Sequence, residues 1–197
     1  MIWNKKTYKN YSDEELMEMI SKLNKSAFTE LYERYSKPML IYFKRLLWND
    51  HEKAEDFVQD LFTKIIQQNQ LFDRNRNFKT WIYAVANNMC KNEYKKQSVR
   101  KNTQYYVEDV QHLIADQKKN LTILTQEQDF SRLFEKELNL LDDKHKEVFE
   151  LRHLDGLSIK EIADFMEINE GTVKSRLFYA TKTLAEKLKM FQETYHE

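Results

Sequence analysis

The residues best suited to chemistry in this chain are the cations, hydroxyls and aromatic rings gathered in residues 172–189. Five basic residues stand there against one acid, Glu186. The apolar residues recur at helical spacing and predict one buried stripe, made of Val173, Leu177, Ala180, Leu184 and Leu188. The other side carries groups that bind phosphates and base edges in a major groove: Lys174, Ser175, Arg176, Phe178, Tyr179 and Lys182. Thr172 and the helix N-terminus suit a phosphate. DNA binding is the predicted chemistry.

A shorter helix must position this one. Ser158 and Glu161 have the spacing of a capping box, which predicts a helix that starts at Ser158. Its inward residues would be Ile159, Ile162, Ala163 and Met166. Residues 167–169 then form a polar turn in which Asn169 is a natural cap for the next helix. Two helices joined by a tight turn favour a helix-turn-helix, although an ordinary helical hairpin with a solvated charged face has the same spacing.

Composition indicates a helical protein of one or two small domains. The 197 residues include only two glycines and one proline, which argues against a β-sandwich or a β-barrel. No apolar run approaches the roughly 18–20 residues needed to span a bilayer, and residues 1–6 lack the apolar stretch of a signal peptide. A cytoplasmic location is therefore expected.

The sequence gives no sign of catalytic or metal chemistry. The single cysteine, Cys90, lies in a helical pattern and is expected to be a packed small residue. The five histidines are scattered, without cysteine or acidic partners at ligand spacing. No glycine-rich phosphate loop or nucleophilic triad is present. We expect no enzyme activity, no metal and no cofactor.

The most regular helix of the first half covers residues 54–66. Its apolar residues fall at i, i+3, i+4, i+7, i+8, i+11 and i+12. Its outer face carries Glu55, Asp56, Gln59, Asp60 and Lys64. Acids early in a helix suit its dipole, and this alone would account for them.

A second informative helix is predicted over residues 78–96, preceded by a polar loop with Leu71 and Phe72 as anchors. Phe78, Trp81, Ile82, Val85 and Met89 would cover one side, with Tyr83, Asn87 and Lys91 on another. Aromatic rings interleaved with lysines and amides serve single-strand binding, because bases stack on the rings while cations hold phosphates. Trp81 and Tyr83 could equally be core residues.

The rest of the chain supplies helices and a linker. Helices are expected over residues 12–23 and 26–48, the latter with an aromatic core face and with Pro38 at a bend or a helix start. Residues 98–130 lack sustained periodicity and carry five acids, so we expect an acidic linker between two basic modules. Helical patterning returns over residues 131–154.

Three segments resemble sigma factors of the sigma-70 family, extracytoplasmic-function branch. They are Ala54-Glu-Asp-Phe-Val-Gln-Asp-Leu-Phe-Thr-Lys64, the helix of residues 78–96, and residues 138–152 followed by Gly171-Thr-Val-Lys-Ser-Arg-Leu177. Their order in the chain is that of the family. The resemblance implies an all-α protein with two small helical domains joined by a flexible linker: residues 1–97, a linker at 98–130, residues 131–190, and a tail at 191–197.

The resemblance also implies partners and sites. The partners would be core RNA polymerase, promoter DNA and an anti-sigma factor, often membrane-bound in this branch, with no small-molecule substrate. Core polymerase would meet Glu55, Asp56, Gln59, Asp60, Phe62 and Lys64 through a basic coiled coil. Minus-10 DNA would meet Phe78, Lys79, Thr80, Trp81, Tyr83, Asn87, Asn88, Lys91 and Lys95. Minus-35 DNA would meet Thr172, Val173, Lys174, Ser175, Arg176, Phe178, Tyr179 and Lys182, with Arg176 the best candidate for a guanine.

The chain departs from the family at two positions, and two other functions fit part of it. Asn87 stands where a basic residue is common and Asn92 where an acid is usual, which leaves the minus-10 base preference open. A stand-alone helix-turn-helix regulator would use the first half as a sensor or dimerisation domain and would not need the acidic face of residues 54–66. A helical adaptor or anti-sigma partner would not need the basic helix.

Overall fold

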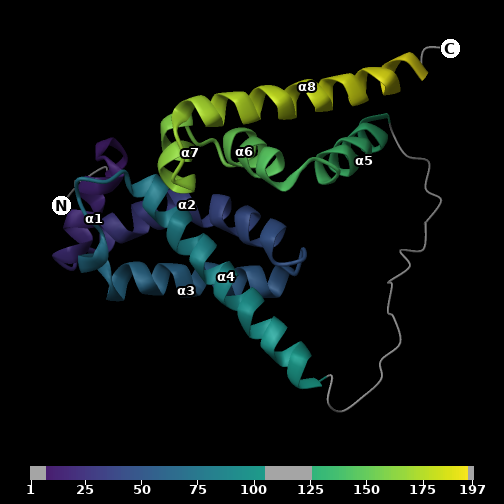
Figure 1. Cartoon of the computed structure of the whole chain (residues 1–197). Helices are drawn as coiled ribbons and strands as arrows, with labels where there is room; N and C mark the ends of the chain where they lie inside the picture. Colours follow the sequence, from purple (N-terminus) through teal and green to yellow (C-terminus); the bar gives the residue numbers. More distant parts are fainter. Residues whose placement is uncertain (1–7, 105–125, 195–197) are drawn as a thin grey trace. The chain divides into compact units, whose positions relative to one another are not determined.

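The computed structural model describes residues 8–104 and 126–194, and these residues form helices without strands, in agreement with the predicted all-α class (Figure 1). The elements in chain order are η1 (Tyr8–Asn10), α1 (Asp13–Ser21), α2 (Lys25–Leu46), α3 (His51–Gln67), η2 (Asn69–Leu71), α4 (Phe78–Gln104), α5 (Gln126–Asn139), α6 (Asp143–His153), α7 (Ile159–Met166) and α8 (Glu170–Thr194). The chain divides into two compact units, Met1–Arg100 and Lys101–Glu197. Within the described ranges no helix is both long and apolar enough to cross a membrane.

Side-chain caps fix where the helices of the first unit begin. Ser12 and Glu15 form the predicted capping box of α1, with Ser12 N–H donating to Glu15 Oε2 at 2.7 Å. Asn24 Oδ1 accepts from the first amides of α2, and Asp50 Oδ1 accepts from Lys53 N–H at the start of α3. Each cap satisfies amides that have no partner inside the helix.

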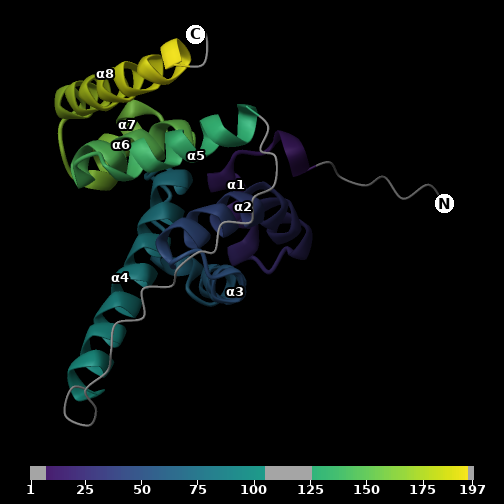
Figure 2. The ribbon, with the colours of Figure 1, turned by 90° about the vertical axis from the view of Figure 1, so that its right-hand side faces the viewer.

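The first unit is built on α2 and α3, which lie side by side, with α4 running across them (Figures 1 and 2). Its fully buried side chains come from all four helices and include Leu16, Leu31, Phe43, Leu61, Ile65, Phe78, Ile82 and Tyr83. Cys90 is also fully buried, as predicted, and burial raises the pKa of its thiol to about 12. Aromatic rings meet mostly edge to face, as between Tyr42 and Tyr83 with centroids 5.1 Å apart.

One arginine fastens the start of the unit to α2. The Arg34 guanidinium donates to Asp13 Oδ1 at 2.7 Å and to Glu30 Oε1 at 2.9 Å. It also donates to three main-chain carbonyl oxygens, those of Tyr8, Lys9 and Tyr11. The five donors of a guanidinium suit such a junction, and they hold α1 where it can reach α4.

The structure adds detail to two expectations about element boundaries. Of the two positions expected for Pro38, a bend or a helix start, the helix start is excluded, because Pro38 lies inside α2. Pro38 is exposed, so its ring lies on the side of α2 away from the core. The linker expected at 98–130 is helical at both ends, since α4 continues to Gln104 and α5 begins at Gln126. The middle of that linker and the tail beyond Thr194 lie outside the described residues.

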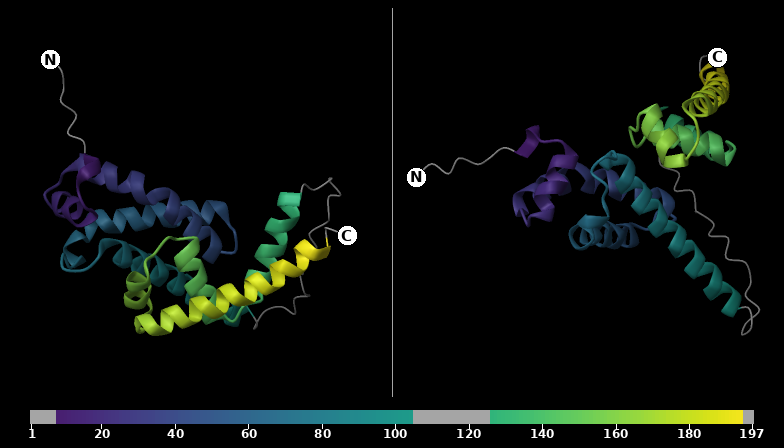
Figure 3. Two further views of the ribbon diagram at one scale, coloured as in Figure 1. Left: turned by 90° about the horizontal axis from the view of Figure 1, so that it is seen from above. Right: turned by 60° about the vertical axis from the view of Figure 1, so that its left-hand side comes forward.

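The second unit packs α8 against α5, α6 and α7 (Figure 3). One cluster of its core joins Leu138 and Phe149 to Ala180 and Leu184 of α8, with Phe134 and Leu141 packed against it. Gly156 has φ of 67° in the turn before α7, a conformation that favours glycine. Leu157 follows, fully buried, and its N–H donates to the Leu151 carbonyl at 2.9 Å.

Candidate nucleic-acid and protein interfaces

The outer face of α3 presents the predicted row of charged and amide side chains. The exposed members are Glu55, Asp56, Gln59, Asp60 and Lys64. Phe62 differs, because it is only 3% exposed and its ring lies 4.7 Å from that of Tyr32 and 6.0 Å from that of Phe28. Phe62 is thus a core residue, which corrects its assignment as a surface contact. Its position in the apolar stripe was the signal for burial.

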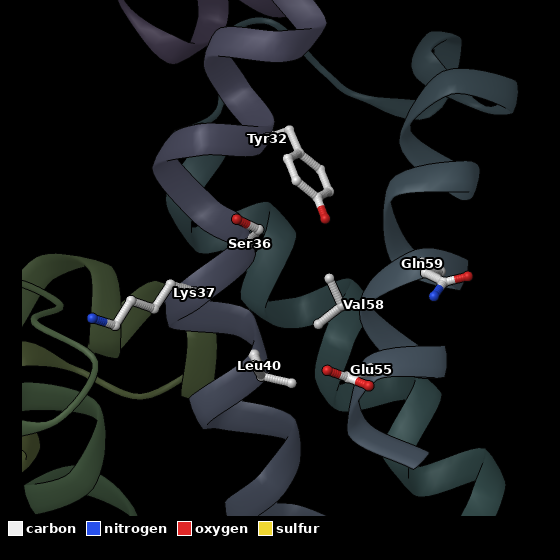
Figure 4. Close-up of a pocket in the computed structure, with 7 residues that line it drawn as sticks. All are labelled: Tyr32, Ser36, Lys37, Leu40, Glu55, Val58 and Gln59. Atoms are coloured by element: carbon white, nitrogen blue, oxygen red, sulfur yellow. The ribbon is translucent and has the colours of Figure 1, made fainter. Parts of the chain in front are cut away.

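A hollow of about 400 Å³ opens between α2 and α3 beside this row (Figure 4). Its lining residues are Tyr32, Ser36, Lys37 and Leu40 of α2 with Glu55, Val58 and Gln59 of α3. Leu40 and Val58 provide apolar surface, while the Lys37 ammonium points away from the other six side chains. A long basic side chain would fit, since its stem can cover the apolar part while its cation meets Glu55.

Sequence reasoning missed the contribution of α2 to this hollow. The aromatic residues of 26–48 were all assigned to the core, yet Tyr32 is exposed. Ser36 follows Tyr32 by one helical turn, and Lys37 comes next. Polar residues that interrupt an aromatic stripe at this spacing are the signal that could have placed Tyr32 at a surface.

The N-terminus of α4 is held by the loop before it and by α1. Asn77 Oδ1 accepts from Thr80 N–H at 2.9 Å, and the Phe78 N–H donates to Glu14 Oε1 of α1 at 2.9 Å. The Trp81 ring lies 5.2 Å from that of Phe72, the predicted loop anchor, which is buried. These contacts set the orientation of the predicted minus-10 helix.

Along α4 the structure separates the predicted minus-10 residues into two groups. Phe78 and Tyr83 are fully buried, and the inward stripe runs through Phe78, Ile82, Tyr83, Ala86 and Cys90. The assignment of Phe78 and Tyr83 as DNA contacts is therefore corrected, because no part of either ring reaches the surface. Lys79, Thr80, Trp81 and Asn87 are half-buried, and Asn88, Lys91 and Lys95 are exposed.

The helix-turn-helix geometry follows the sequence prediction closely. Ser158 N–H donates to Glu161 Oε2 at 2.7 Å and Glu161 N–H donates to Ser158 Oγ at 3.2 Å, which completes the capping box. Asn169 Oδ1 accepts from Thr172 N–H at 2.7 Å and caps α8 as predicted. Between the helices, Glu167 adopts a left-handed φ of 55° that turns the chain.

On α8 most of the predicted minus-35 residues lie at the surface. Lys174, Ser175, Phe178, Tyr179 and Lys182 are exposed, Thr172 and Arg176 are half-buried, and Val173 is fully buried. Val173 is thus a core residue, which corrects its assignment as a DNA contact. Lys174 and Lys182 lie 3.7 and 3.9 Å from Glu170 and Glu186 in exposed pairs. Such pairs are weak, so phosphates can compete for both lysines.

Each of two family profiles matches one of the two units. The profile of sigma-70 region 2 matches residues 31–100, which contain α3 and most of α2 and α4. The profile of sigma-70 region 4 matches residues 131–184, from α5 into α8. Both describe one family, and together they cover more than half of the chain. The chain belongs to the sigma-70 family.

Relatives place this sigma-70 protein in the extracytoplasmic-function (ECF) branch. It is 27% identical over 187 residues to the ECF RNA polymerase sigma factor SigW of Bacillus subtilis, covering 88% of this chain and 95% of SigW. It is 29% identical over 184 residues to the ECF RNA polymerase sigma-E factor of Haemophilus influenzae, covering 90% of this chain and 95% of the relative.

A solved structure also resembles this chain. It is that of the sigma factor RpoE in complex with the anti-sigma factor NepR from Bartonella quintana. The TM-score is 0.56 at 28% identity, with 82% of this chain and 96% of RpoE covered. This similarity agrees with the two-unit helical architecture and with the sigma-factor family.

Proposed function

We propose that this sigma factor binds core RNA polymerase through the outer face of α3 together with the hollow between α2 and α3. The observation that carries this assignment is the acid-rich exposed row Glu55, Asp56, Gln59 and Asp60 next to a hollow with an apolar part. A basic helical surface of the polymerase would bury its side-chain stems there and neutralise the acids. Binding to core then directs the enzyme to promoters.

The α4 helix opens and holds the minus-10 element. Trp81 is half-exposed and backed by Phe72, so its free face can stack on an unpaired base. Asn87 and Asn88 carry amides of the kind that read adenine edges, and Lys91 and Lys95 bind the phosphates. The cost of opening the base pairs is offset by these stacking and phosphate contacts.

The α8 helix reads the minus-35 element in the major groove. Arg176 carries the donor pair that suits a guanine, and Phe178 and Tyr179 offer apolar contact to thymine methyl groups. Thr172 and the capped N-terminus of α8 bind a phosphate. The shorter helix α7 lies behind α8 and supports its angle of entry, as in other helix-turn-helix modules.

We further propose a cytoplasmic site of action and regulation by an anti-sigma factor. RpoE, which this chain resembles, was solved in complex with the anti-sigma factor NepR. An anti-sigma factor that covers the α2–α3 hollow of this chain would block the docking of core polymerase. Such competition accounts for control by a protein partner without any small-molecule ligand.

The decisive experiment measures binding to purified core polymerase by native chain, Asp60→Arg and Glu135→Arg. Asp60 is exposed on α3, and Glu135 is exposed on α5 of the other unit, so the two variants carry the same change in charge. We expect Asp60→Arg to bind core at least about tenfold more weakly, because it places a cation against a basic partner, and Glu135→Arg to bind as the native chain does. Run-off transcription on genomic fragments then identifies the promoters used by the native holoenzyme.

Two outcomes would contradict the assignment. Equal weakening by both reversals would mean that overall charge, and not the α3 face, governs binding. The native chain could also fail to bind core polymerase and yet bind duplex DNA alone with a steep salt dependence. That result would favour the stand-alone regulator.

A further inference from the structure

The turn between α2 and α3 carries a tryptophan in an unfavourable backbone conformation. Trp48 and Asn49 both have left-handed φ values, 54° and 61°. Asparagine tolerates this region, whereas a bulky residue there costs about 1–2 kcal/mol. The side chain gains little burial in return, since Trp48 is 58% exposed. Backbone strain held for an exposed ring is typical of a functional contact.

The ring is nevertheless fixed from two helices. The Tyr94 ring of α4 meets it edge to face at 5.1 Å, and Lys53 Nζ of α3 lies 5.7 Å from its centroid. Lys53 is in turn paired with Glu93 Oε1 of α4 at 2.6 Å, and both side chains are largely buried. The Tyr94 hydroxyl donates to the Leu46 carbonyl at the end of α2. Trp48 is therefore a preorganised ring and not a loose one.

The charges around this ring suit a polyanion. Along α4 the residues that flank Tyr94 include three exposed lysines, Lys91, Lys95 and Lys96. The acid within this run, Glu93, is engaged by Lys53. The Asp50 carboxylate next to Trp48 is engaged as the cap of α3. A rigid aromatic ring beside solvated ammonium groups favours nucleic acid as the occupant.

The position of Tyr94 along α4 indicates which part of the promoter DNA Trp48 would contact. Tyr94 lies about 20 Å beyond Trp81 along the helix axis, at 1.5 Å per residue. That distance corresponds to about six base pairs at 3.4 Å per step. Trp48 is thus too far from Trp81 to share the same unpaired base, and would meet the duplex that flanks the opened segment.

We propose that Trp48 is a further DNA-contacting residue, whose ring packs against the sugars of the promoter duplex that adjoins the minus-10 phosphates held by Lys91 and Lys95. This assignment rests on the proposed function and extends it to the α2–α3 turn. Trp48 anchors the holoenzyme on double-stranded DNA and adds affinity that does not depend on base sequence.

The first test compares native chain, Trp48→Gly and Trp48→Phe as holoenzymes on a promoter fragment identified with the native holoenzyme. Glycine removes the ring and suits the left-handed backbone, so Trp48→Gly should fold and bind core as the native chain does. We expect its promoter affinity to fall about tenfold, and Trp48→Phe to retain most of the native affinity. Native promoter affinity in Trp48→Gly would overturn the proposal.

A second test identifies the occupant directly. The photo-crosslinking residue p-benzoylphenylalanine is placed at position 48 and, as a matched control, at position 23. Leu23 is 86% exposed and also has a left-handed φ, 62°, at the end of α1. We expect promoter DNA to crosslink to position 48 and not to position 23.

The crosslinking outcomes separate the two proposals. Crosslinks from position 48 to a polymerase subunit, or none at all, would overturn the DNA assignment while leaving the sigma-factor function intact. Failure of the native chain to bind core polymerase would instead remove the proposed function before Trp48 is tested.

Discussion

The two helices that we propose to read DNA, α4 and α8, differ in how their aromatic residues are used. On α8, Phe178 and Tyr179 are 61% and 56% exposed, and the buried positions hold aliphatic residues such as Val173 and Leu184. On α4, Phe78 and Tyr83 are fully buried. On α8 both of these rings are exposed, whereas on α4 two of the four aromatic rings, those of Phe78 and Tyr83, belong to the core.

This difference shows when residue type can identify a contact. In α8 a regular aliphatic stripe fixes the buried side, so any ring outside it must be exposed. In α4 apolar residues occupy several sides, because the helix packs both on α2 and α3 and under the Phe72 loop. Periodicity then predicts no single buried face, and an aromatic residue of α4 can be either a core residue or a surface contact.

The largest expected effect is the loss of a buried ring. Tyr83→Ala should lower the free energy of unfolding by about 3–5 kcal/mol, because it leaves a cavity between α4 and Tyr42. Urea denaturation followed by circular dichroism measures this loss. A change below about 1 kcal/mol would contradict the burial of Tyr83 and would return it to the set of DNA contacts.

Replacing an exposed tyrosine of α8 by alanine should have the opposite effects: a small change in stability and a large loss of DNA affinity. Tyr179→Ala should change the free energy of unfolding by less than about 0.5 kcal/mol, since the ring is mostly solvated. Its holoenzyme should bind a minus-35-containing fragment about tenfold more weakly, as measured by gel shift. If Tyr179→Ala unfolds like Tyr83→Ala, the contrast between the two helices does not hold.

The smallest effect concerns the ion pair that joins α3 to α4. Hydrogen bonding from Lys53 lowers the pKa of Glu93 below its ordinary value of 4.5. The pKa of Glu93 in the folded protein lies below its pKa in the unfolded chain. The stabilisation by the ion pair is therefore complete above about pH 4.5, and it is lost as the pH falls through the folded pKa. The pair keeps some exposure to water, 26% for the Lys53 side chain and 13% for that of Glu93, so screening limits its contribution to about 1 kcal/mol or less.

This pH dependence is measured as a difference between proteins. The free energy of unfolding of the native chain minus that of Glu93→Gln should be constant above pH 5 and should shrink in more acidic solution, in the window below about 4.5. The subtraction cancels the contribution of the other carboxylates to the pH dependence, because they are present in both proteins. A difference that does not change with pH would show that the pair contributes no linked stability.

Most of the helices and their starts could be predicted because the signals are local. Ser12 with Glu15, Ser158 with Glu161, and Asn169 each place a side-chain oxygen where free amides need it, and all three caps are present. The apolar spacing of α3 and α8 likewise requires only the helical period.

Features that depend on packing between elements could not be predicted in the same way. The hollow beside Tyr32 needs the neighbouring helix, and the burial of Tyr83 needs the ring of Tyr42 across the core. Pro38 is tolerated inside α2 because the position is exposed, which the one-dimensional pattern did not reveal. Trp48 attracts notice only once its backbone conformation and exposure are known.

The buried thiol described in the first unit makes the chain convenient for spectroscopy. Thiol-reactive dyes attack the thiolate, and Cys90 combines complete burial with a pKa of about 12, so it should stay unlabelled in the folded protein. Cysteines introduced at exposed positions, one in each unit, would then take donor and acceptor dyes without removal of the native residue. Energy transfer between them would report how far apart the two units lie, alone and on the polymerase.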